Sequence, residues 1–222
     1  MNDIFFNPKV ISIIRDEFIK MEPHFSDMRR AAQSWGEHPD WPWNGFVLSY
    51  ATLGGSANWE KRVGPQYDEL YGWSVLSRLT LDERRKRLKK IPNPRFAERV
   101  SEWIFGSYER IAREGGPTAV RALYLSQTTA KARIAYVQSY PGFGAKYGRN
   151  IPMDCYDELV RDHFALDHRL KKLLSACGFP SVSYRQGENI LRYLASVLNI
   201  DAWALDRLLY GRFEVIKTKI ES

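Results

Sequence analysis

Apolar residues recur at spacings of three and four along most of this chain, and that pattern limits the fold more than any other feature. The spacing is that of one face of an α-helix. It predicts helices at Pro8–Glu22, Thr80–Lys90, Arg95–Glu114, Thr118–Leu125, Thr129–Ser139 and Gln186–Leu198. Glycine and proline separate these segments, and Thr80 with Glu83 three residues later is typical of a capping box at a helix start. Because no alternating strand pattern accompanies them, we predict an all-α fold.

The length of the chain permits a hydrophobic core that needs neither disulfides nor metals. With 222 residues, one domain or two closely packed subdomains are expected. No apolar run reaches the length of a membrane span, and residues 1–6 lack the basic start and apolar core of a signal peptide. These observations predict an intracellular protein that does not bind a membrane.

Cysteine and histidine are too few and too scattered for a metal centre. Two cysteines exclude a four-cysteine iron–sulfur cluster, and an intracellular disulfide framework is not expected. His163 and His168 are five residues apart, so they do not share a helical face. We therefore predict no metal site and no cofactor.

The positive charge of the chain favours a polyanionic partner. The net charge is +7 and the pI is near 9.4, which suits binding to phosphates. The densest basic run is Glu83–Lys90. We interpret this run as a solvated helix face in preference to a DNA contact, and the tryptophans of the aromatic-rich region 38–73 as core residues.

The most informative stretch is Ser139-Tyr140-Pro141-Gly142-Phe143-Gly144-Ala145-Lys146 and the residues up to Ile151. Pro141 ends the preceding helix, and Gly142 and Gly144 allow a sharp turn with close approach of a ligand to the backbone. A second helix is predicted to start near Ala145, and Pro152 is expected to shorten it. Backbone N–H groups at such a helix start favour an anion, for which a DNA phosphate is suited.

These residues, followed by Tyr147-Gly148-Arg149-Asn150-Ile151, closely resemble the hairpin of the helix-hairpin-helix superfamily of endonuclease III and 8-oxoguanine DNA glycosylases. In its bifunctional members a lysine stands two residues after the second glycine, and that position is Lys146 here. The resemblance implies a catalytic role for Lys146. It implies DNA contacts, mainly with phosphates, at Tyr140, Gly142, Phe143, Gly144, Ala145 and Arg149.

The same superfamily has an essential aspartate downstream of the hairpin, preceded by apolar residues and followed by a helix start. Phe164-Ala165-Leu166-Asp167 fits this pattern, so the resemblance implies that Asp167 is catalytic. An N-cap is the ordinary structural role for such a residue and is compatible with catalysis. Asp154 and Asp162 stay open as alternative working carboxylates.

The resemblance extends over most of the chain from about Trp43, and its C-terminal part, Trp203–Tyr210, is similar to compact archaeal-type 8-oxoguanine glycosylases. It implies two helical subdomains with a cleft between them, which the hairpin and Asp167 face. We place one subdomain at about 45–140 and the second at 1–44 plus 141–222. A residue from the loop Leu53–Trp59 is expected to probe the duplex.

The resemblance therefore predicts a monomeric DNA glycosylase that flips a damaged base, with 8-oxoguanine as the first candidate, out of double-stranded DNA. Lys146 would add AP (apurinic/apyrimidinic) lyase activity through a Schiff base once its pKa is lowered, and Arg149 is a candidate neighbour for that effect. Such an enzyme needs no cofactor and is cytoplasmic, or nuclear or nucleoid-associated with the DNA. Three alternatives stay open: a non-enzymatic DNA-binding hairpin module, a monofunctional glycosylase for another lesion, and a protein of this fold that binds damage without excision.

Overall fold

All regular secondary structure is helical in the described part of the computed structural model, which comprises residues 5–53, 63–91, 93 and 96–222. The described residues form twelve α-helices, a 3₁₀ turn and a π turn, and they contain no strand. The predicted all-α class is confirmed. The bounds are α1 Pro8–Glu37, α2 Trp43–Thr52, η1 Gly64–Gln66, η2 Tyr67–Tyr71, α4 Trp73–Leu76, α5 Leu81–Leu88, α6 Ala97–Arg113, α7 Pro117–Leu125, α8 Ala130–Gln138, α9 Ala145–Asp154, α10 His168–Ala176, α11 Tyr184–Leu198, α12 Ala202–Gly211 and α13 Phe213–Glu221.

Local sequence signals explain several of these ends. The Thr80 hydroxyl accepts from Glu83 N and the Glu83 carboxylate accepts from Thr80 N, so the predicted capping box is confirmed. Ser183 and Gln186 form a second capping box at the start of α11. Helix α9 continues to Asp154, two residues beyond Pro152.

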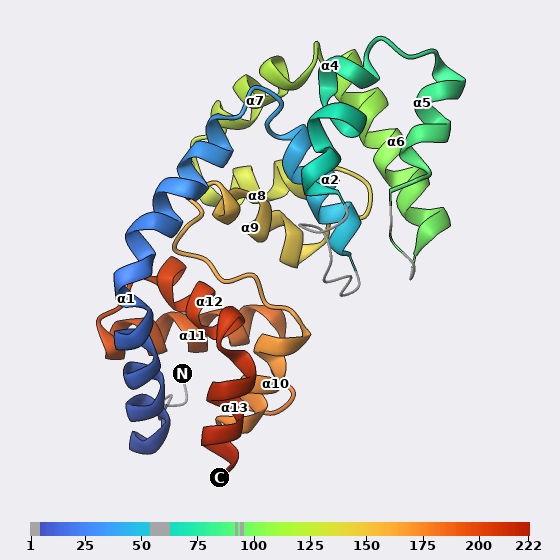
Figure 1. Ribbon diagram of the computed structural model, residues 1–222. Helices are drawn as coiled ribbons and strands as arrows, with labels where there is room; N and C mark the ends of the chain where they lie inside the picture. The colour runs from blue at the N-terminus through green and yellow to red at the C-terminus, as the bar shows by residue number, and fades with distance from the viewer. Residues whose placement is uncertain (1–4, 54–62, 92, 94–95) are drawn as a thin grey trace.

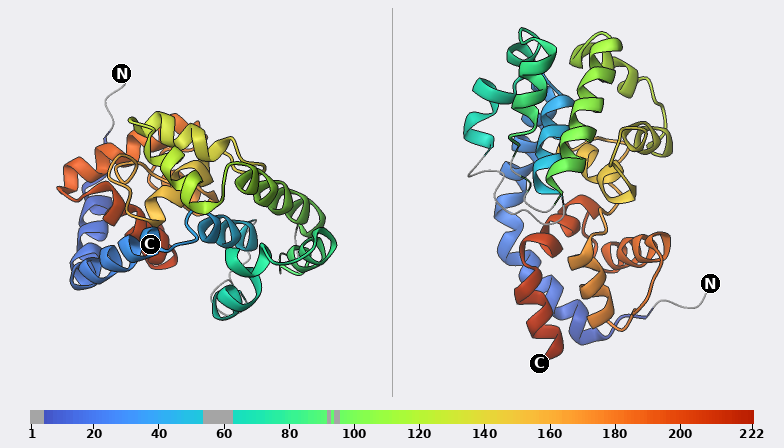
Figure 2. Two further views of the ribbon diagram at one scale, coloured as in Figure 1. Left: turned by 90° about the horizontal axis from the view of Figure 1, so that it is seen from above. Right: turned by 90° about the vertical axis from the view of Figure 1, so that its right-hand side faces the viewer.

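The buried apolar residues form two clusters, one in each half of the molecule (Figure 1). The lower cluster joins α1 to α10, α11, α12 and α13, whereas the upper cluster joins α2, η2 and α4 to α6, α7 and α8. Trp41 and Trp43 lie inside the upper cluster, as expected for core tryptophans; Trp59 and most of the probing loop Leu53–Trp59 lie outside the described residues. Helix α1 runs beside both halves (Figure 2).

Helices α8 and α9 lie between the two clusters and pack closely against each other. Ile134 and Met153 belong to the lower cluster, but Tyr140, Phe143 and Ile151 belong to the upper one. The division into 45–140 and 1–44 plus 141–222 stays a prediction about domains. The two clusters do not separate at residue 140, because the turn between α8 and α9 packs on α2 and so belongs to the upper cluster.

Candidate active site

The turn between α8 and α9 is fixed by contacts from the upper half. The Tyr50 hydroxyl donates to the Pro141 carbonyl at 2.5 Å, and Arg110 donates to the Ser139 carbonyl at 3.0 Å. Gly142 has a φ of +77°, and a Cβ there would lie 2.5 Å from the Trp103 ring. Gly142 is therefore required by the fold itself.

Gly144 differs from Gly142 because a Cβ at this position would meet open space. It is the N-cap residue of α9, and no side chain caps the N–H groups of the first turn. Within the described part of the chain these N–H groups have no capping side chain, so they could bind an anion that approaches along the open side of Gly144. Ala145, the first helical residue, is half-buried beside it.

The two aromatic residues predicted as DNA contacts have buried side chains. Tyr140 and Phe143 are 1% and 4% exposed, and both rings pack edge-on against Phe46 of α2. The Tyr140 hydroxyl donates to Glu114. The upper half therefore covers both rings, and a DNA contact at Tyr140 or Phe143 stays a prediction.

Lys146 lies in the first turn of α9 and is half-buried. Its Nζ lies 4.0 Å from the centroid of the Tyr147 ring. Burial lowers the pKa of Lys146 below its usual range. A lysine with a lowered pKa is neutral, and hence nucleophilic, at a less alkaline pH than an exposed one.

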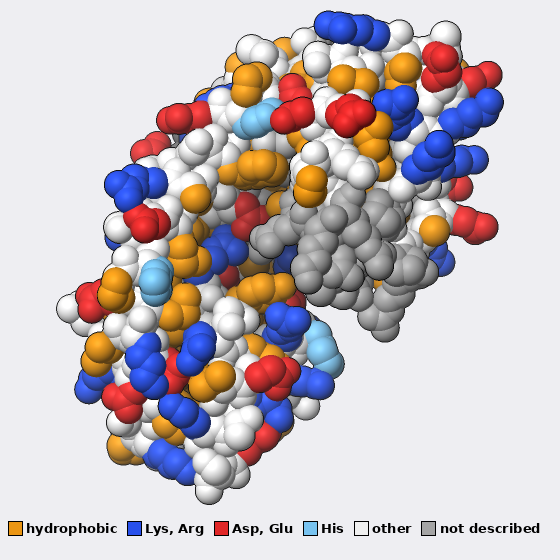
Figure 3. Space-filling model, viewed as in Figure 1, with side chains coloured by type: hydrophobic (Ala, Val, Ile, Leu, Met, Phe, Trp, Pro, Cys, Tyr) orange, Lys and Arg blue, Asp and Glu red, His pale blue; other side chains and the backbone are white. Residues whose placement is uncertain are grey.

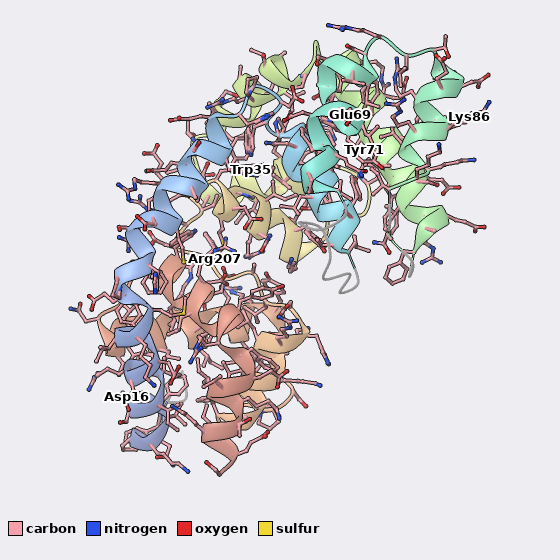
Figure 4. The ribbon with its side chains drawn as sticks, viewed as in Figure 1. Asp16, Trp35, Glu69, Tyr71, Lys86 and Arg207 are labelled. Atoms are coloured by element: carbon pink, nitrogen blue, oxygen red, sulfur yellow. The ribbon has the colours of Figure 1, made fainter. Side chains whose placement is uncertain are left out.

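Four charged side chains act on Lys146. Three carboxylates partly oppose the lowering of its pKa and one guanidinium adds to it; they are Asp154, Asp167, Asp206 and Arg207. Asp154 and Arg207 form an ion pair at 2.9 Å, and Arg207 lies at the junction between the two halves (Figure 4). The surface of the molecule is hollowed in this region (Figure 3). We refer to Lys146 and these four residues as the lysine cluster.

Asp167 caps α10, because its carboxylate accepts from Leu170 N at 2.9 Å. The structure brings Asp167 and Asp154 into the electrostatic environment of Lys146. The third candidate, Asp162, is exposed on the loop before His163 and is not among the groups that shift the pKa of Lys146.

Arg149, the candidate neighbour for lowering the pKa of Lys146, is paired with another side chain. Its guanidinium binds both carboxylate oxygens of Glu188, at 3.0 and 2.9 Å, and stacks on the Tyr184 ring. After burial, Arg207 is a cation that contributes to lowering the pKa of Lys146. A role of Arg149 in DNA binding stays a prediction, and it would compete with a buried ion pair.

Asp206 and Arg207 are the site residues that sequence reasoning missed. Both lie on α12, and Asp206 is only 3% exposed. Burial raises the pKa of Asp206 and of Asp154, with Arg207 opposing the shift in each case. The available signal was a charged pair in an otherwise apolar helix, Ala202–Leu209.

Within residues 5–53, 63–91, 93 and 96–222, no group of three potential ligands is arranged to hold a metal ion. Both cysteine thiols are free, and burial raises their pKa, to about 12 for Cys177. No described helix is long and apolar enough to cross a membrane.

Comparison with known proteins gives a structural match but no sequence match. No protein-family model matches the chain, and no curated protein matches it in sequence. Among solved structures, the 8-oxoguanine DNA glycosylase Tm1821 of Thermotoga maritima is similar, with a TM-score of 0.64 and 19% identity over 90% of this chain and 93% of that one. The chain therefore has the helical fold of a DNA glycosylase, and at this identity the likeness establishes the fold alone.

Proposed function

We propose that the protein is a DNA glycosylase that removes a damaged base from double-stranded DNA and then cleaves the strand as an AP lyase. One observation carries the proposal. A half-buried lysine with a lowered pKa, Lys146, directly follows an open glycine turn and lies in the electrostatic range of Asp167. The fold shared with an 8-oxoguanine DNA glycosylase supports it.

The α8–α9 turn is the proposed grip on the DNA backbone, as a helix-hairpin-helix. The uncapped N–H groups of the first turn of α9 would bind a phosphate, and the absence of a side chain at Gly144 lets it approach. Such a contact fixes the position of the duplex without reading its sequence. The net charge of +7 supports binding to this polyanion.

A base inside a duplex cannot reach Lys146, so the nucleotide must be flipped out of the stack. The hollow between the two halves, where Arg207 lies, is the proposed destination (Figures 3 and 4). Asp167 would stabilise the positive charge that develops on the sugar as the bond from C1′ to the base lengthens.

Neutral Lys146 then forms a bond from Nζ to C1′ while the base leaves with the electron pair of the broken bond and takes up a proton. Opening of the sugar ring gives a protonated imine, the Schiff base. Loss of a proton from C2′ expels the 3′ phosphate, and water hydrolyses the imine to regenerate the amine. These steps need no cofactor.

We propose 8-oxoguanine as the first lesion to test, because the similarity at Trp203–Tyr210 and the structural neighbour both point to it. The protein is proposed to act as a monomer wherever the genomic DNA lies.

The decisive experiment is borohydride trapping with duplexes that contain 8-oxoguanine or an abasic site. We expect a covalent adduct with the wild type and none with Lys146→Gln, while Lys171→Gln, an exposed lysine of α10, retains it. Base release without an adduct would make the enzyme a monofunctional glycosylase. Binding with neither product, on a broad panel of lesions, would overturn the proposal in favour of a non-enzymatic module.

A further inference from the structure

We infer that Tyr184, Glu188 and the Asp206–Arg207 pair form a bridge that fixes the segment carrying Asp167 to the helix carrying Lys146. In this arrangement the bridge residues are positioning residues for the two proposed catalytic groups. The inference rests on the proposed function for its catalytic consequence, but its structural part can be tested without it.

The first observation concerns three successive backbone N–H groups in the extended segment before Asp167. Phe164 N donates to Glu188 at 3.4 Å, Ala165 N donates to Asp206 at 3.1 Å, and Leu166 N donates to the Tyr184 hydroxyl at 3.1 Å. All three acceptors are side chains of α11 or α12. The segment is thus held one residue after another up to the point where Asp167 caps α10.

The second observation is that the same side chains, or an immediate neighbour, also contact α9. The Tyr184 hydroxyl lies 3.2 Å from the Ala145 carbonyl, and Glu188 binds Arg149 through both oxygens. Arg207, next to Asp206, pairs with Asp154 at 2.9 Å. The three connections are spread along α9 from its first residue to its last.

Ordinary packing does not require this arrangement. Glu188 and Asp206 are 6% and 3% exposed, and burying two carboxylates is unfavourable unless they are paired and hydrogen-bonded. Here Glu188 joins Arg149 of α9 to the N–H of Phe164, and it also contacts His163, directly before that segment, at 2.6 Å and Arg192 of its own helix at 3.5 Å. Asp206 and the Tyr184 hydroxyl add the contacts to Ala165 N and Leu166 N. Catalytic groups displaced by about 1 Å lose on the order of 10²-fold in rate, which gives a reason to hold these two elements together.

The least disruptive test is Tyr184→Phe, because it removes only the hydroxyl and keeps the ring on which Arg149 stacks. The matched control is Tyr136→Phe, which removes a hydroxyl that donates to Glu114 in the upper half. Amide hydrogen exchange of the free proteins is measured first. We expect faster exchange at 164–167 in Tyr184→Phe and no change there in Tyr136→Phe. Unchanged exchange would show that the bridge does not hold the segment.

The second measurement is a double-mutant cycle for trapping on 8-oxoguanine DNA, where the base must leave before the adduct forms, with Asp167→Asn as the second change. If Tyr184 acts by positioning Asp167, Tyr184→Phe slows trapping by about 10-fold or more in the wild type and has little effect in the Asp167→Asn background. Equal losses in both backgrounds, or faster exchange with an unchanged trapping rate, would overturn the positioning role.

Failure of the proposed function and failure of the bridge give different results. A wild type that neither releases bases nor forms an adduct contradicts the proposed function and the catalytic consequence together. The exchange experiment still decides whether the bridge exists.

Discussion

Glu17 and Lys146 are both ionisable side chains withdrawn from water, but the surroundings of Glu17 stabilise its charged form whereas those of Lys146 disfavour it. Glu17 of α1 has a fully buried carboxylate that accepts from Lys20 and Lys219 at 2.7 Å and from Arg212 at 2.8 Å. The hydrogen bonds from Lys20 and Lys219 are the main reason that the pKa of Glu17 falls to about 2. We call this group the glutamate cluster; it fastens α1 to the C-terminal end of the chain.

In the lysine cluster, burial works against the charged forms. It lowers the pKa of Lys146 and raises that of Asp154 and Asp206. Arg207 pairs closely with Asp154, and no carboxylate lies within ion-pair distance of Lys146 among the described residues. The glutamate cluster is organised for stability, whereas the lysine cluster keeps poorly solvated charges of the kind that active sites contain.

The largest expected effect separates the two clusters by function. Asp167→Asn should lower the rate of base release by about 10²–10³-fold, as loss of one electrostatic stabiliser does in other enzymes. Asparagine caps a helix about as well as aspartate, so α10 and the affinity for DNA should be retained. Single-turnover excision and binding to uncleavable abasic-site DNA measure the two effects.

The matched control is Asp201→Asn, which changes the N-cap of α12 in the same way. It should leave excision unchanged. If Asp167→Asn is fully active while Asp154→Asn is not, the working carboxylate is on α9 and the assignment of Asp167 is wrong.

The next effect concerns the glutamate cluster. Glu17→Gln should lower the free energy of unfolding by about 2 kcal/mol, below the usual cost of breaking a buried ion pair because its cations are partly exposed. Excision should not change. Urea denaturation at neutral pH measures the loss, and an unchanged midpoint would contradict the stabilising role.

The sign of the pH dependence follows from the lowered pKa of Glu17. The carboxylate contributes stability that is fully present above its ordinary pKa of 4.5 and is lost as the pH falls towards 2. The difference between the wild type and Glu17→Gln should therefore shrink on acidification. A difference that stays constant down to pH 2 would show that the variant acts through packing alone.

The turn between α8 and α9, and the place of Lys146 just after it, could be predicted from the sequence because their signals are local. Proline and glycine between two segments of helical period define a turn, and Lys146 follows it directly. The same applies to the N-cap position of Asp167. Residues within a few positions of one another keep their relation in any fold that preserves the helices.

The rest of the site depends on contacts between distant segments. Asp206 and Arg207 are about 60 residues from Lys146, and the packing of α12 against α9 and the 164–166 segment brings them to it. The burial of the Tyr140 and Phe143 rings was also unpredictable, because it depends on Phe46 of α2. Aromatic residues in a turn look like ligand contacts until the surface that covers them is known.

A smaller effect tests how the charges of the lysine cluster act on one another. The Asp154 carboxylate raises the pKa of Lys146, so Asp154→Asn should lower that pKa further. The neutral amine then persists at a lower pH, and the acid limb of the trapping rate against pH should move to lower pH. Asp68→Asn, a 90% exposed carboxylate on η2, should leave the profile in place. A shift to higher pH would show that Asp154 serves as a proton acceptor for Lys146.

The smallest expected effect is on the stability of Lys146→Met, which tests whether the lysine cluster is as necessary to the fold as the glutamate cluster. Because burial lowers the pKa of Lys146, its ammonium form is disfavoured in the folded protein at neutral pH. Lys146→Met should therefore be as stable as the wild type or more stable by up to about 1 kcal/mol, although it is inactive. The gain should fade as the pH rises towards 10.5, where the unfolded lysine also loses its proton. Urea denaturation measures this gain in stability, with Lys171→Met on the exposed face of α10 as the control without a gain.

A loss of stability of more than about 1 kcal/mol in Lys146→Met would mean that the three carboxylates depend on the ammonium group. The lysine cluster would then be a structural ion network like that of Glu17, and the contrast between the two would no longer identify the active site.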